Sequence, residues 1–139
     1  MADRQMGEVG AIVPIRAARG LGMFSIALGL AEIVGKRPIA RWLGLEDSPA
    51  ARKTLVAFGV REIAAGAMAL QAPAVSLNMW NRVGGDMMDA GALALALRSS
   101  TRKRAIAGAL AFVGAAMVAD VLTARALDRR TGRALPQAN

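Results

Sequence analysis

The sequence contains no cysteine, no histidine and no tyrosine. Without cysteine, the chain can form neither a disulfide bond nor a thiolate nucleophile. Without histidine, it lacks the commonest general base, the commonest metal ligand and the side chain that titrates near neutral pH. Gly-rich phosphate-binding motifs and a nucleophile elbow are also missing. We therefore expect a protein that is not an enzyme, with no catalytic residues, no metal and no other cofactor.

Aromatic residues make up only 4% of the 139 residues, whereas hydrophobic residues make up 55%. The core of a soluble domain usually draws much of its buried area from aromatic side chains. Here Ala, Gly, Leu, Val and Met supply the apolar surface, as they do in tightly packed membrane helices. The composition therefore favours a membrane protein, and the length is enough for a single domain over 1–139.

Four apolar blocks run through the chain, at about 16–35, 49–72, 79–98 and 104–127. Each is long enough for a membrane-spanning helix, because about 20 helical residues cross a bilayer. β-branched residues are few and do not alternate, which argues against strands. The sequence predicts an all-α fold, namely a four-helix transmembrane bundle with a short interfacial segment between the first two helices. Polar tails are expected at 1–15 and 128–139.

Local signals support several of these boundaries. Ser48 followed by Pro49 is typical of an N-cap and a first-turn proline. Pro73 cannot continue the second helix, because it lacks the backbone N–H and its ring clashes with the preceding turn. The two tryptophans, Trp42 and Trp80, lie at block ends, where an indole anchors well at the headgroup level of a bilayer.

The net charge is +8, and most basic residues flank the apolar blocks. That placement suits lipid headgroups and membrane topology better than a nucleic-acid-binding face. We expect a multi-pass protein of the bacterial inner (cytoplasmic) membrane, with the lipid bilayer as a partner and no nucleic acid. A soluble four-helix bundle is the alternative, and it is disfavoured because residues 105–119 carry no polar side chain.

Charged residues nevertheless lie inside the blocks and form a predicted intramembrane network: Arg61, Glu62, Arg82, Asp86, Asp89, Glu32 and Asp120. A charge at the bilayer centre costs at least about 2.5–3.5 kcal/mol, so these groups must be paired, protonated or hydrated. Arg82, Asp86 and Asp89 share one helix face, because their spacing is i, i+4, i+7. A short loop makes the second and third blocks antiparallel neighbours, which would bring Arg61 close to that face.

Several roles for this network stay open. A structural lock between the second and third helices is the simplest. The surplus of carboxylates also fits a proton- or ion-handling site, or a site for a partner or a lipid headgroup. A hard-cation site at Asp86 and Asp89 is disfavoured, because two carboxylates are too few ligands.

The fourth block carries a ridge of small residues with a spacing of four, formed by Ala107, Ala111, Ala115 and Ala119. Such ridges let helix backbones approach closely in lipid. We expect this alanine ridge to be a helix-packing surface, either within the chain or between copies.

Three stretches carry a resemblance to a known family: RAARGLGMFSIALGLAEIV with RPIARWLGLED, then FGVREIAAGAMAL, then WNRVGGDMMDAGALALAL. Together they look like the small four-helix membrane module of bacterial cyclase/dehydrase-like proteins, which occurs alone or ahead of a START-like domain. The resemblance covers about 16–127, and its most specific parts are the patterns GxREIxxG and RxxGDxxD. It implies an integral bacterial membrane protein without an established activity. Because the chain ends about a dozen residues after the fourth block, we expect no START-like domain.

The sequence therefore predicts a small accessory or scaffold subunit that packs against itself, as a homo-oligomer, or against a larger membrane complex. The alternative is a proton-coupled carrier, or a binder of lipid or another small molecule, that uses the intramembrane carboxylates. A membrane enzyme is disfavoured, because no nucleophile or metal constellation is present.

Overall fold

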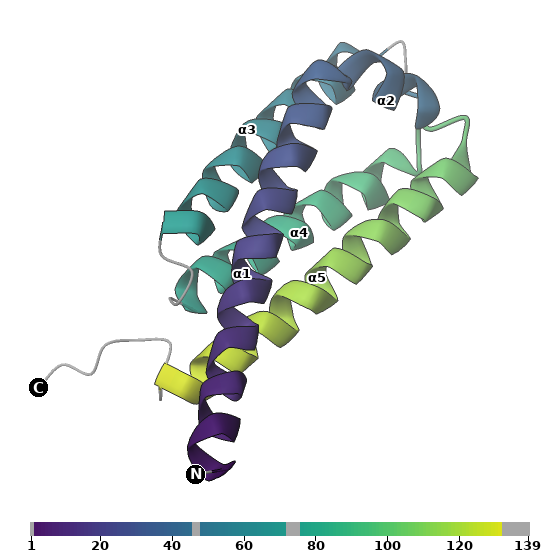
Figure 1. Ribbon diagram of the computed structural model, residues 1–139. Helices are drawn as coiled ribbons and strands as arrows, with labels where there is room; N and C mark the ends of the chain where they lie inside the picture. The colour runs from purple at the N-terminus through teal and green to yellow at the C-terminus, as the bar shows by residue number, and fades with distance from the viewer. Residues whose placement is uncertain (1, 46–47, 72–75, 132–139) are drawn as a thin grey trace, which may run out of the picture.

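The computed structural model describes residues 2–45, 48–71 and 76–131. These residues form five helices and no strand: α1 Ala2–Val34, α2 Lys36–Trp42, α3 Pro49–Gln71, α4 Ser76–Ala96 and α5 Lys103–Thr131 (Figure 1). The prediction of an all-α fold is confirmed. The seven-residue α2 takes the place of the short segment expected between the first two long helices.

The ends of the helices differ from the expected ones mainly where the chain is polar. α1 begins at Ala2, so most of the expected polar tail at 1–15 is helical. α5 continues to Thr131, so the start of the expected tail at 128–139 is helical as well. The physical reason is that Ala, Arg, Gln, Met and Glu are good helix formers, so a polar segment outside the apolar blocks can still be helical. The start of α3 lies at Pro49 as expected, and the Ala51 N–H donates to Ser48 Oγ at 3.1 Å. Pro73 lies outside the described residues.

The long helices associate in two pairs, in which α1 runs along α3 and α4 runs along α5 (Figure 1). Glycines allow the close approach of α1 and α3. A Cβ on Gly66 would lie 2.5 Å from the carbonyl oxygen of Gly22, and a Cβ on Gly59 would lie 2.5 Å from that of Gly29. The two backbones are therefore in direct contact, which small residues permit in helix pairs.

The short helix α2 lies beside the turn between α4 and α5 (Figure 1). Ser100 Oγ donates to the Leu43 carbonyl at 2.6 Å and accepts from the Arg102 N–H at 2.9 Å. Gly44 has a φ of 68°, a left-handed conformation that favours glycine, and a Cβ there would lie 2.7 Å from the Arg102 nitrogen. These contacts fasten the end of α2 to the second helix pair.

Several charged side chains are buried, and several large apolar side chains are exposed. Arg82 and Asp120 are only 3% and 0% exposed. In contrast, Val34, Leu95 and Met87 are 83%, 65% and 63% exposed. Exposed apolar surface of this extent marks a region that contacts lipid or another protein.

Two helices contain stretches that are long and apolar enough to cross a membrane, Val13–Val34 in α1 and Lys103–Arg129 in α5. Only 22% of the α1 window and 11% of the α5 window are buried within the fold, so neither resembles the core helix of a soluble protein. Within the described ranges, α3 and α4 do not meet the same criterion. The structure thus supports two candidate spans, fewer than the four that were predicted.

Candidate functional site

The candidate site begins at Arg61, in the middle of α3. Its Nη2 atom lies 2.6 Å from Glu62 Oε1 and 2.7 Å from Asp89 Oδ2. The guanidinium carbon lies 5.6 Å from the centre of the Phe58 ring, one turn earlier on α3. The expected bridge between α3 and the face of α4 that carries Asp89 is therefore present.

Glu62 connects this bridge to α1. Ser25 Oγ contacts both the Glu62 carboxylate and the Glu62 carbonyl oxygen, the latter at 2.9 Å. Ser25 is 0% exposed, and it was not among the predicted site residues. A signal was available, because Gly22, Ser25 and Gly29 are spaced i, i+3, i+7 and so share one helix face.

Arg82 points toward α5 and not toward Asp86 on its own helix. Its Nε atom lies 3.0 Å from Asp120 Oδ2, and its Nη1 atom lies 3.7 Å from Glu62 Oε2. The i, i+4 spacing suggested an ion pair between Arg82 and Asp86, and no such pair is found among the described residues. The fully buried Asp120 is a competing partner from another helix, which spacing along one helix could not reveal.

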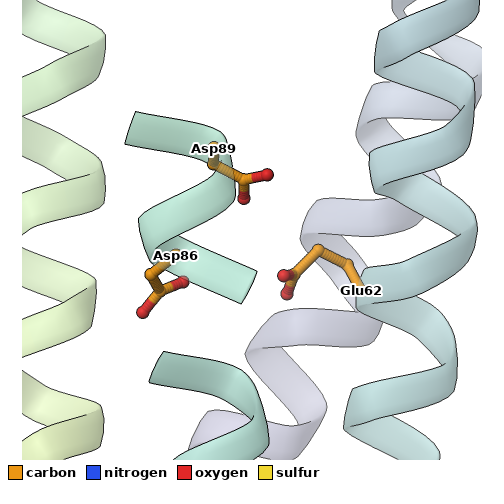
Figure 2. Close-up of side chains that lie close together, drawn as sticks. All are labelled: Glu62, Asp86 and Asp89. Atoms are coloured by element: carbon orange, nitrogen blue, oxygen red, sulfur yellow. The ribbon is translucent and has the colours of Figure 1, made fainter. Parts of the chain in front are cut away.

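Carboxylates from α3 and α4 gather at the centre of the molecule. Glu62 points from α3 toward the helix that carries Asp86 and Asp89 (Figure 2). One carboxylate oxygen from each of the three residues lies within 4.8 Å of the others. Such a set has the donor chemistry of a hard-cation site. Arg61 already contacts two of its members, however, so a guanidinium supplies positive charge there.

Two carboxylates of the network have no cationic partner within ion-pair distance in the described part of the chain. They are Glu32 on α1 and Asp86 on α4, and the buried atoms Glu32 Oε2 and Asp86 Oδ2 accept no hydrogen bond there. The network thus contains five carboxyl groups and two guanidinium groups. Buried groups of this kind usually have a partner, so each unpaired one calls for an explanation.

A cavity of about 660 Å³ adjoins the unpaired carboxylates. Residues from all five helices line it, and most of them are apolar, including Leu28, Ile39, Phe58, Phe112 and Val113. Its volume lies in the range of about 300–1,000 Å³ that is typical of small-molecule sites. Nothing in the sequence pattern indicated this space, because it results from how two helix pairs meet.

The acidic residues of the network divide between the cavity and the packed core. Glu32, Asp86 and Asp89 line the cavity, whereas Glu62 and Asp120 do not. No lysine or arginine lies among the described residues that line it. The cavity is therefore mostly apolar, and its charged lining residues are all acidic.

The remaining predicted features lie away from the charge network. Trp42 is 52% exposed and lines the cavity, while Trp80 Nε1 donates to Asp128 Oδ2 at 2.9 Å. In the alanine ridge, Ala107, Ala111 and Ala115 are exposed and Ala119 is half-buried. The ridge is thus turned away from the other helices of this chain over most of its length.

No protein-family model, no curated protein and no solved structure matches this chain.

Proposed function

We propose that this protein is a multi-pass protein of the bacterial inner membrane, with α1, α3, α4 and α5 all embedded in lipid. The support comes from buried charge together with exposed apolar side chains, since Arg82 is 3% exposed while Val34 is 83% exposed. Ion pairs between helices lower the cost of placing charged residues in a low-dielectric medium. The resemblance to the membrane module of cyclase/dehydrase-like proteins agrees with this proposal and remains a prediction.

Within that membrane setting, the function that the geometry supports best is the binding or carriage of a small amphipathic molecule or lipid. The cavity of about 660 Å³ is the observation that carries this proposal. A mostly apolar pocket with a few convergent polar groups is the usual form of a small-molecule site. From the sequence alone, this role was the alternative to an accessory or scaffold subunit. Because of the cavity, we now favour it over that role. It is a binding role and not an enzymatic one.

Gly108 offers a way to test the cavity without disturbing the packing. It lines the cavity on α5, and a Cβ there would meet no atom within 4 Å. Gly108→Leu should therefore reduce the cavity volume while favouring the helix. Gly114→Leu is the matched control, because Gly114 is also on α5 with nothing within 4 Å and does not line the cavity.

The experiment is native mass spectrometry of the full-length protein after gentle detergent extraction, together with binding of decyl-chain probes. We expect the wild type and Gly114→Leu to retain or bind a small molecule, and Gly108→Leu to lose it. A wild-type protein that carries nothing and binds no decyl probe would overturn the proposal. Equal binding by both leucine variants would also overturn it, because the bound molecule would then lie outside the cavity.

The exposed alanine ridge favours a second candidate, an accessory or scaffold subunit that packs against itself or a larger membrane complex. Ala111 is exposed at the centre of the ridge. If the ridge is an interface, Ala111→Trp should dissociate the assembly without unfolding the chain. Size-exclusion chromatography with light scattering measures this, and an unchanged mass of the protein component would exclude the ridge as the interface.

A further inference from the structure

The cavity has a charge opposite to that of the whole chain. The chain has a net charge of +8, yet the charged residues that line the cavity are Glu32, Asp86 and Asp89. Arg61 and Arg82 lie nearby in the network, but neither is a lining residue. Both already contact carboxylates at 3.0 Å or less. A ligand in the cavity would therefore meet acidic groups and no free basic group among the described lining residues.

Unsatisfied oxygen atoms add a second, independent observation. Asp86 is 6% exposed and Asp89 is 8% exposed. Asp86 Oδ2, Asp89 Oδ1 and Glu32 Oε2 are buried and have no hydrogen-bond partner within the described chain. All three residues line the cavity. A buried acceptor without a donor costs about 1–3 kcal/mol, and more for a charged group, so a donor from a bound molecule would relieve this cost.

The positions of the lining residues give the cavity a polarity along its length. The lining residues run along α4 from Asp86 and Asp89 through Leu93, and then to Ser99 in the turn after α4, which contacts the end of α2. The acidic groups thus lie at the inner end, and mostly apolar side chains follow toward α2. A ligand that matches this order has a cationic head and an apolar body.

Resting on the binding function proposed above, we propose that the cavity recognises an amphipathic amine, with its ammonium head at Asp86, Asp89 and Glu32. A protonated primary amine has three N–H donors and no acceptor, as a lysine head group does. It would supply donors for Glu32 Oε2, Asp86 Oδ2 and Asp89 Oδ1. It would also bring the positive charge that Glu32 and Asp86 lack, since only Asp89 already contacts Arg61. An anionic head would have no donor for these oxygens, and a neutral hydroxyl head would have only one donor and no positive charge.

The test compares probes that share one decyl chain and differ in the head: decylamine, decanol and decanoate. Binding to the full-length protein in a non-ionic detergent is measured by native mass spectrometry and calorimetry. We expect decylamine to bind about tenfold more tightly than decanol or more, because hydrogen bonds to charged groups are the stronger ones. Decanoate should bind most weakly of the three.

Neutral isosteres then locate the head. Asp86→Asn and Glu32→Gln should each reduce the preference for decylamine over decanol by about tenfold while leaving decanol binding unchanged. Asp128→Asn is the charge-matched control, because Asp128 accepts from Trp80 and does not line the cavity. Its preference for decylamine should equal that of the wild type. Thermal unfolding of each variant establishes that it is folded.

The outcomes separate this inference from the function on which it rests. Equal binding of all three probes would overturn the recognition of a cation and leave the cavity as a general binding site. A preference for decanoate would also overturn the recognition of a cation, and it would indicate that Arg61 binds the head of the ligand. Failure of every probe to bind the wild type would overturn both proposals. A decylamine preference that survives both isosteres would remove the carboxylates as the recognition site.

Discussion

The guanidinium of Arg61 occupies the space in which a side chain at position 85 would lie. A Cβ on Gly85 would overlap Arg61 Nη1, and the guanidinium carbon would lie only 2.5 Å away. A side chain at position 85 would therefore displace the Arg61 guanidinium, which comes from a different helix. The neighbouring Gly84 has no such constraint, because a Cβ there would meet nothing within 4 Å.

We accordingly predict that Gly85→Ala displaces the Arg61 guanidinium and destabilises the fold by about 1 kcal/mol, the low end of the cost of overpacking, because the end of a flexible side chain can move. Gly84→Ala is the matched control and should stabilise the helix by up to about 1 kcal/mol. Unfolding by sodium dodecyl sulfate in detergent micelles measures both changes. Equal stability of the two variants would show that Arg61 does not lie against α4.

Replacing Arg61 itself should be costly, because it leaves Asp89 without a cation and Glu62 with only the more distant Arg82. We expect Arg61→Ala to lower the free energy of unfolding by about 3 kcal/mol. This is the lower end of the range for buried pairs, since the Arg61 side chain is 25% exposed. Arg104→Ala, at an exposed position of α5, should change it by less than about 0.5 kcal/mol.

A double-mutant cycle tests whether the loss arises from the pair between Arg61 and Asp89. In the background of Asp89→Asn, the cost of Arg61→Ala should fall, because one of the two stranded carboxylates is already neutral. Strict additivity of the two substitutions would contradict the coupling between α3 and α4.

Two aspartates on facing helices should respond in opposite ways to neutralisation. Asp86 has no cationic partner within ion-pair distance in the described ranges, so Asp86→Asn should leave stability nearly unchanged or raise it. Asp120 contacts Arg82, which is 3% exposed, so Asp120→Asn should cost about 3 kcal/mol. Thermal unfolding in detergent measures both, and a large loss for Asp86→Asn would reveal a partner that it needs.

The contact between α1 and α3 provides a further test. Gly59→Ala would place a Cβ 2.5 Å from the carbonyl oxygen of Gly29, a backbone atom that cannot rotate away. We expect a loss of about 1–3 kcal/mol from the separation of the two helices. Gly20→Ala is the control on α1, because nothing lies within 4 Å of a Cβ there. A neutral effect at both positions would mean that the two backbones are not in contact.

Sequence periodicity was enough to predict the helical class and to identify the charged residues that meet at the centre. The bridge from Arg61 to Asp89 followed from two neighbouring helices and a short connection. The partner of Arg82 did not follow, because Asp120 belongs to a helix whose rotation about its own axis depends on packing along its whole length. Ser25 was missed for a different reason, since a hydroxyl in an apolar block can bond to its own helix as easily as to another.

The cavity was beyond the reach of sequence patterns for a geometric reason. Gly22, Gly29, Gly59 and Gly66 bring α1 and α3 into contact. Among the described residues, no comparable set of glycine contacts joins that pair to α4 and α5 along the cavity. An empty space between helices depends on interhelical angles, and these are set by many small packing preferences together. Phe58 and Phe112, which line the cavity, therefore carry no signal in the sequence that would separate them from other apolar residues.

The charge pairing between α3 and α4 has a consequence for how the chain would enter a bilayer. Alone, α3 exposes Arg61 and Glu62, and α4 exposes Arg82, Asp86 and Asp89, each at a cost of about 2.5–3.5 kcal/mol at the bilayer centre. The connection between them is short, so Arg61 can meet Asp89 as soon as both helices have left the ribosome. In the membrane setting proposed above, α3 and α4 would be inserted together as one hairpin. The more apolar α1 and α5 could each enter on their own, before and after it.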